Sequence, residues 1–148
     1  MSKSFEQLWY DAVAAADKAE REKVTQTFAV VEHVNPLDDN SPVKTAYTNG
    51  GKGFEAEGSC MVKVNGNSAF GRWLKRNADK VTFTRTDHYG GTSRVGNPRV
   101  TTGGYYGGVC FFAPPRGYER SCTWAAAFVG VIDQNVQSAK AITYSFID

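Results

Sequence analysis

The sequence predicts an α+β fold: a mainly antiparallel sheet of about six to seven strands, an N-terminal amphipathic helix and one short internal helix. Three observations support this class. Valine occurs fifteen times and leucine only three times, and β-branched residues favour strands. Apolar residues near the N-terminus repeat at helical spacing, whereas most later ones alternate with polar residues. Tight turns join several alternating segments, and strands connected in this way pair antiparallel.

Residues 4–22 are predicted to form the N-terminal helix. Ser4 and Gln7 have the spacing of a capping box. The apolar residues of this segment then form one stripe, which consists of Phe5, Leu8, Trp9, Ala12, Val13 and Ala16. The small alanines in its middle favour a close approach to a sheet.

Alternation predicts a strand over 24–34, followed by a loop at 35–42. Two further strands, 43–48 and 53–64, flank the turn sequence Asn-Gly-Gly-Lys at 49–52 and are expected to form a hairpin. One face of the second strand is expected to face water, because its apolar residues alternate with Glu55, Glu57, Ser59, Met61 and Lys63.

The short internal helix is predicted over 69–78, with Asn67 or Ser68 as its N-cap. Phe70, Trp73 and Leu74 would point inward from this helix. Beyond it, the pattern predicts a strand at 81–88 and a long loop at 89–104 that is rich in Gly, Thr, Ser, Asn and Arg.

The last third of the chain is predicted to contain three strands. Segments 105–112 and 121–132 would be joined by a turn, and the second is apolar on both faces, as in a central strand. Residues 133–140 fit either a loop or a short helix, and 141–147 fit a closing strand. Neither a repeat nor a linker interrupts the pattern, so 1–148 is expected to be a single domain.

The cysteines predict a reducing environment and no metal site. Cys60, Cys110 and Cys122 are odd in number and lack a CxxC spacing, and only two histidines accompany them. Cys110 and Cys122 flank a predicted turn, which leaves open whether they pair. No cofactor is expected. The N-terminus lacks an apolar leader and no apolar stretch is long enough to cross a bilayer, so we expect a cytoplasmic protein, or one of the host cytoplasm or virion if it is viral.

Charge is distributed unevenly along the chain, although its net value is only +2. Residues 1–58 contain six basic and ten acidic residues, whereas residues 59–148 contain eleven and five. Seven of the eight arginines lie between positions 72 and 120. Arginine suits bidentate contacts with phosphate or carboxylate groups. This part of the sequence therefore predicts a surface that binds an anion.

We expect this basic surface to combine cations with tyrosines that stack on bases. The candidate binding residues are Arg72, Lys75, Arg76, Arg85, Arg94, Arg99, Tyr105, Tyr106, Arg116 and Arg120. A more local candidate lies at 64–76, where a strand end, Gly66 and a helix N-terminus precede Arg72 and Lys75. This segment lacks the Lys-Ser/Thr of a phosphate-binding P-loop.

Motifs for hydrolases, zinc enzymes and dinucleotide binding are absent, which favours a binding protein over an enzyme. The leading hypothesis is a non-enzymatic protein that binds nucleic acid, a nucleotide or an acidic protein surface, as a phage-type accessory protein would. A structural or assembly subunit, virion-like or homo-oligomeric and joined by its acidic and basic halves, is the alternative. A third hypothesis is a small enzyme that acts on a phosphorylated ligand through His88 with Arg85 or Arg94.

Overall fold

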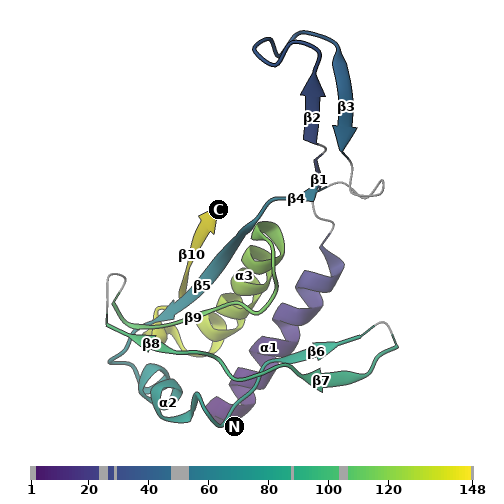
Figure 1. Ribbon diagram of the computed structural model, residues 1–148. Coiled ribbons are helices and arrows are strands. Elements are labelled where there is room, and N and C mark those ends of the chain that lie inside the picture. The colour runs from purple at the N-terminus through teal and green to yellow at the C-terminus, as the bar shows by residue number, and fades with distance from the viewer. Residues whose placement is uncertain are drawn as a thin grey trace.

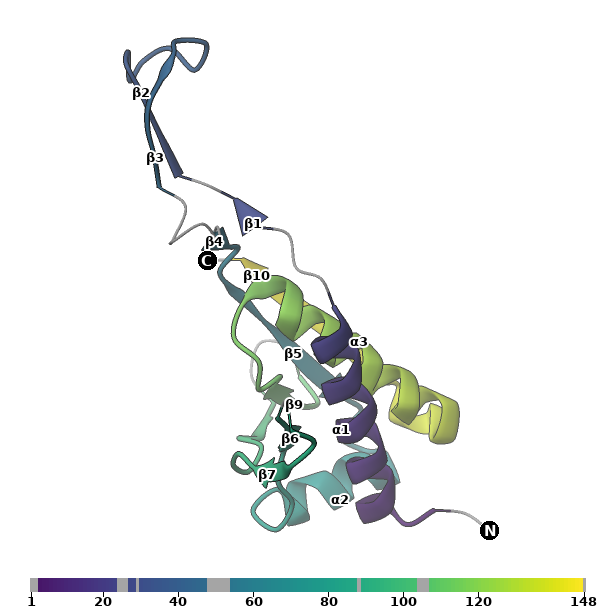
Figure 2. The same cartoon turned by 90° about the vertical axis from the view of Figure 1, so that its right-hand side faces the viewer.

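The computed structural model describes residues 3–23, 27–28, 30–47, 54–87, 89–103 and 107–147, and it has the predicted α+β architecture. Within these residues, the main sheet is antiparallel and has the strand order β10 (Ile142–Ile147), β5 (Gly58–Val64), β9 (Val109–Phe112) and β8 (Thr101–Thr102). Helix α3 (Tyr118–Asn135) packs against the sheet, α1 (Phe5–Glu22) lies beside α3, and α2 (Ala69–Asn77) lies at one end of the body (Figures 1 and 2).

Aromatic rings fill the space between the helices and the sheet. The Trp9 ring of α1 lies 5.4 Å from Phe111 of β9 and 5.2 Å from Phe128 of α3, measured between centroids. Trp124 stacks on Phe128 at 5.2 Å. The predicted start of α1 is confirmed, because Ser4 Oγ accepts a hydrogen bond from the Gln7 amide at 3.1 Å. The main neighbour of α1 is α3, whereas we expected a sheet.

The prediction of a strand over 121–132 is wrong, because this segment lies inside α3. Its fully buried residues follow helical spacing: Ser121, Trp124, Ala125, Phe128 and Ile132. The intervening positions include valines, so the segment is apolar almost all round and its helical period is obscured. Residues 133–140 comprise the end of α3 and a 3₁₀ turn over Gln137–Ala139.

The predicted hairpin between 43–48 and 53–64 is also wrong. Strand β3 (Val43–Tyr47) pairs with β2 (Val30–His33), and β5 pairs with β9 and β10. Strands β1 (Thr27–Phe28) and β4 (Phe54–Glu55) lie before and after this ribbon in the chain and pair with each other. We call residues 30–47 the arm, because the ribbon projects away from the body (Figures 1 and 2). The turn residues 49–52 lie outside the described residues.

The predicted strand 81–88 is confirmed only over β6 (Thr84–Thr86). It pairs with β7 (Thr92–Arg94) in a further two-stranded ribbon, so the prediction of a continuous loop over 89–104 is wrong. The backbone of Thr82 joins this ribbon to α1: the indole of Trp9 donates to the Thr82 carbonyl at 3.1 Å, and the Thr82 amide donates to the Tyr10 hydroxyl at 3.3 Å. No helix in the described part of the chain has the length and apolar character that a bilayer crossing requires.

Candidate anion-binding site

The structure distributes the predicted anion-binding residues over several hollows of the surface. Lys75 lines one hollow, and Arg85 and Arg120 line a second. Arg99 lines a third, and Arg116 lines a fourth. The predicted set therefore does not form one continuous binding site around a single cavity.

The other predicted residues lie on two elements or outside the described residues. Arg72 and Arg76 are on α2, and Arg94 is on β7. The Arg72 side chain donates a hydrogen bond from Nη1 to the Asn67 carbonyl at 3.1 Å, which holds it against the turn before α2. Tyr105 and Tyr106 are outside the described residues, as is His88 of the enzyme hypothesis.

Arg85 and Arg120 are held by carboxylates of the same chain. Arg85 Nε lies 2.9 Å from Asp17 Oδ1, and its Nη2 lies 3.0 Å from Glu20 Oε2. Arg120 Nη2 lies 2.8 Å from Glu55 Oε1, and its Nη1 lies 3.5 Å from Glu20 Oε1. Asp17 and Glu20 are each only 3% exposed. These ion pairs join α1, β4, β6 and α3.

The hydrogen bonds from the Arg120 guanidinium to Glu55 raise the pKa of Arg120. If an external anion drew Arg85 or Arg120 away, the buried carboxylates would lose their counter-charge, which is costly inside a protein. The cluster therefore has a structural role, and its two arginines are engaged by carboxylates of the same chain.

The hollow that Lys75 lines has a volume of about 550 Å³ and collects three cations from distant parts of the chain. Lys63 comes from β5, Lys75 from α2, and Lys140 from the residues just before β10. We call this hollow the lysine pocket. Its described lining contains no aspartate or glutamate and consists of Lys63, Asn65, Gly66, Asn67, Lys75, Thr102, Gly103, Gly108, Lys140 and Ile142.

Two short-range features build this pocket. The amide of Asn65, just after β5, donates to the Ala139 carbonyl at 2.6 Å and so brings Lys140 beside the end of β5. Ser68 then caps α2 by accepting a hydrogen bond from the Gly71 amide at 3.0 Å. This cap fixes the direction of the helix that presents Lys75. The segment 64–76, which the sequence analysis singled out, thus forms one wall of the pocket.

Gly108, just before β9, also lines the pocket and lies next to the end of β5. Its φ of +64° lies in the left-handed region that favours glycine. A Cβ at this position would lie 2.6 Å from the Val64 carbonyl oxygen and 2.9 Å from Cε of Lys63. Glycine is therefore needed for the close approach of this turn to β5 and to the lysine stem.

The lysine pocket opens beside the sheet face that points away from the helical core. On β5, Cys60, Val62 and Val64 are buried in the core, so Lys63 and Met61 project from the opposite face, which we call the outer face. Strand register places further apolar residues there, opposite or beside these two: Cys110, Phe112, Ile142, Tyr144 and Phe146.

Two contacts confirm this arrangement. Lys63 Nζ lies 5.9 Å from the centroid of the Tyr144 ring. The rings of Phe112 and Phe146 lie 6.1 Å apart. Phe112 is 54% exposed, which is unusual for a phenylalanine on a sheet. The outer face thus offers aromatic surface next to a group of cations.

The candidate residues that sequence reasoning missed are Lys63, Lys140, Phe112, Tyr144 and Phe146. A signal was present for Lys63, because alternation placed it on the solvent-facing side of its strand. For Phe112, Tyr144 and Phe146, the necessary information was the pairing of β5 with β9 and β10, which brings together segments that are far apart in sequence. For Lys140 it was the hydrogen bond between Asn65 and Ala139.

Two of the three cysteine thiols, Cys60 and Cys110, are poor nucleophiles because their pKa is raised. Burial of the Cys60 side chain, together with the neighbouring Cys122 thiol, raises the pKa of Cys60 to about 12. Burial also raises the pKa of Cys110. Cys110 lies in β9 and Cys122 in α3, and both thiols are free, so the two cysteines do not pair. The described residues contain no group of three or more histidines, cysteines or acidic residues placed to hold a metal ion.

Comparisons of the chain with protein families, curated proteins and solved structures found no match.

Proposed function

We propose that the protein is a non-enzymatic binding protein whose lysine pocket holds the anionic groups of its partner. The observation that supports this most is the convergence of Lys63, Lys75 and Lys140 on one hollow whose described lining lacks a carboxylate. Ammonium groups attract phosphate as point charges, and glycine turns allow a close approach of backbone amides to an anion. Of the residues predicted for a basic surface at 72–120, this proposal keeps only Lys75, and it adds Lys63 and Lys140 from outside that range.

Calorimetric titration with inorganic tripolyphosphate tests this proposal. We expect replacement of Lys63, Lys75 and Lys140 together by alanine to weaken binding about 150-fold or more, because each of the three charge-assisted contacts contributes about 1 kcal/mol or more. The matched control replaces Lys18, Lys23 and Lys80, which are exposed lysines outside the pocket. It removes the same net charge and should change the affinity by less than about threefold.

Salt dependence gives a second readout of the same site. Binding of a polyanion releases counterions, with a slope of log K against log salt of about −0.7 to −0.9 per phosphate neutralised. The pocket variant should show a shallower slope than the control variant. If both triple variants lose affinity equally, general electrostatic attraction explains the binding and the pocket is not the site.

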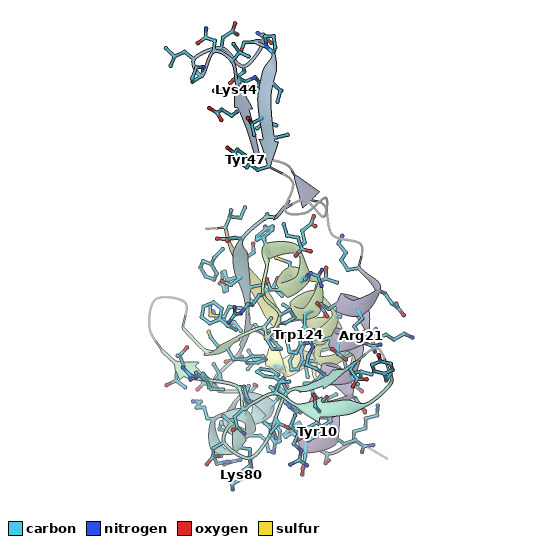
Figure 3. All side chains as sticks on the ribbon, turned by 45° about the vertical axis from the view of Figure 1, so that its right-hand side comes forward. Tyr10, Arg21, Lys44, Tyr47, Lys80 and Trp124 are labelled. Carbon is cyan, nitrogen blue, oxygen red and sulfur yellow. The ribbon has the colours of Figure 1, made fainter. Side chains whose placement is uncertain are left out.

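The arm favours a second candidate function, which is assembly with further copies of the chain. Half of the exposed large apolar side chains in the described residues belong to the arm: Val31, Val34, Leu37, Val43 and Tyr47. Leu37, in the loop between the two strands, is 96% exposed. Figure 3 shows the labelled Lys44 and Tyr47 far from Trp124 in the core. A two-stranded ribbon is only marginally stable alone, so a partner would stabilise it.

Charge favours a second copy as that partner. The arm contains Glu32, Asp38 and Asp39 against one lysine, Lys44. The lysine pocket of another copy has the complementary charge, and such head-to-tail contacts build rings or filaments. Sedimentation at low and high salt tests this candidate. We expect association at low salt that Leu37→Ser weakens and that tripolyphosphate reverses; a monomer at micromolar concentration under both conditions would exclude it.

A further inference from the structure

We propose that the anionic partner of the lysine pocket is a single-stranded nucleic acid that continues from the pocket across the outer face of the sheet. This inference rests on the proposed function, because it uses the same pocket for phosphate groups. It adds a surface that a free phosphate or a polyphosphate would not use, namely the aromatic rings of Tyr144, Phe146 and Phe112.

The geometry of β10 places these rings in line with the pocket. Ile142 lines the pocket, and Tyr144 and Phe146 follow at alternate positions on the same face. Four residues of a strand span roughly 13 Å at about 3.3 Å per residue. The two rings therefore follow one another along β10, leading away from the pocket. Phe112 extends the aromatic surface across β9, since its ring lies next to that of Phe146.

The chemistry of the face selects unpaired bases. Bases of a duplex are already stacked and offer only groove edges, whereas unpaired bases stack on aromatic side chains without regard to sequence. Lysines supply the phosphate contacts, and Lys63 lies at the junction because its ammonium is near both the pocket and the Tyr144 ring. A double helix would meet only the lysines.

Fluorescence anisotropy with a labelled oligothymidylate of about 12 nucleotides tests the inference. We expect Phe112→Ala and Tyr144→Ala each to weaken its binding by about five- to a hundredfold, as loss of one base-stacking ring does. Tripolyphosphate affinity should change by less than about threefold. Tyr47→Ala, which removes an exposed aromatic ring from the arm, is the matched control and should bind as the parent protein does. Because Phe112 is largely exposed, its variant is expected to fold.

The outcomes separate this inference from the proposed function. If tripolyphosphate and the oligonucleotide both fail to bind, the proposed function itself is excluded. If the lysine variant loses both ligands while the aromatic variants bind the oligonucleotide unchanged, the pocket stands and the single-strand inference is overturned. Equal affinity for a duplex of the same length overturns it as well. Recovery of oligonucleotide binding in Tyr144→Phe, which restores the ring without the hydroxyl, supports stacking.

Discussion

At the scale of single residues, the left-handed backbone conformation of Gly108 determines the shape of the lysine pocket. We expect Gly108→Ala to lower the free energy of unfolding by about 2–4 kcal/mol, because the new methyl group is both in a left-handed conformation and against the Val64 carbonyl. The side chain of Lys63 must also shift. Urea unfolding measures the first effect, and tripolyphosphate titration measures the second.

The neighbouring Gly107 provides the control for this substitution. Its φ of +66° is nearly the same, but a Cβ there would meet no atom within 4 Å. Gly107→Ala should therefore lose only the conformational term of roughly 1–2 kcal/mol and keep its affinity for the anion. If both variants lose the same stability and affinity, the close approach at Gly108 does not shape the pocket.

Because the pKa of the Cys60 thiol is raised, we expect the free energy of unfolding to fall at alkaline pH. Its pKa is raised to about 12 in the folded protein, whereas an unfolded thiol ionises near pH 9. Between these values the unfolded chain releases the proton and the folded one retains it, so the free energy of unfolding falls as pH rises above about 9. At pH 10 this contribution amounts to about 1 kcal/mol, and it vanishes below pH 8.

The measurement compares urea unfolding at pH 8 and pH 10 in the parent protein and in Cys60→Ala. The variant also loses packing, but this loss is the same at both pH values, so the difference between them isolates the thiol. A pH dependence equal to that of the parent would mean that other groups, such as the buried Cys110, account for the alkaline loss.

At the scale of the elements, the N-cap of α2 determines where Lys75 is presented. Ser68→Ala should lower the free energy of unfolding by about 1 kcal/mol, because the Gly71 amide loses its acceptor. The Ser68 hydroxyl also donates to the Asn65 carbonyl at 2.6 Å, so the turn that lines the pocket loosens and tripolyphosphate binding should weaken.

Ser4→Ala provides the comparison, because Ser4 caps α1 through the same kind of hydrogen bond, outside the pocket lining. Urea unfolding should show a similar loss of about 1 kcal/mol, whereas the affinity for tripolyphosphate should stay constant. An affinity that falls equally in both variants would show that stability alone governs binding.

The two helices with local capping signals were predicted well from the sequence. Ser4 is an N-cap as its capping-box spacing predicted, and of the two candidates Asn67 and Ser68 the structure has Ser68 as the N-cap of α2. Both helices end within one residue of the predicted ends. Helix α3 was not predicted because its start is Gly117, whose N-cap position carries no side-chain hydrogen bond. Without such a signal, the valines around Trp124 and Phe128 favoured a strand.

The sequence predicted only the part of the candidate site whose residues are close together in the chain. Gly66 and Lys75 are a few residues apart, so a strand end and a helix start sufficed to connect them. Lys140 reaches the same pocket only through the hydrogen bond between Asn65 and Ala139, which local sequence patterns do not reveal. Arg85 and Arg120 stabilise the fold because they pair with carboxylates that are distant in sequence, and local sequence patterns do not reveal these pairs either.

At the scale of the whole molecule, charge and apolar surface are divided between two parts. The body holds the aromatic core, the lysine pocket and the outer face of the sheet, whereas the arm is acidic and its apolar side chains are exposed. The pocket and the arm are therefore separate surfaces of one chain. In the assembly candidate they bind each other between copies, and in the nucleic-acid proposal only the body binds.

Removal of the arm separates these two cases. Val30 and Tyr47 are direct antiparallel partners, so residues 31–46 can be replaced by Asn-Gly, whose two-residue turn joins such partners. No arm residue belongs to the described core, so we expect the free energy of unfolding, followed by tryptophan fluorescence, to change by less than about 0.5 kcal/mol. Affinity for oligothymidylate should persist, and any self-association should disappear. A loss above about 2 kcal/mol would instead show that the arm stabilises the body.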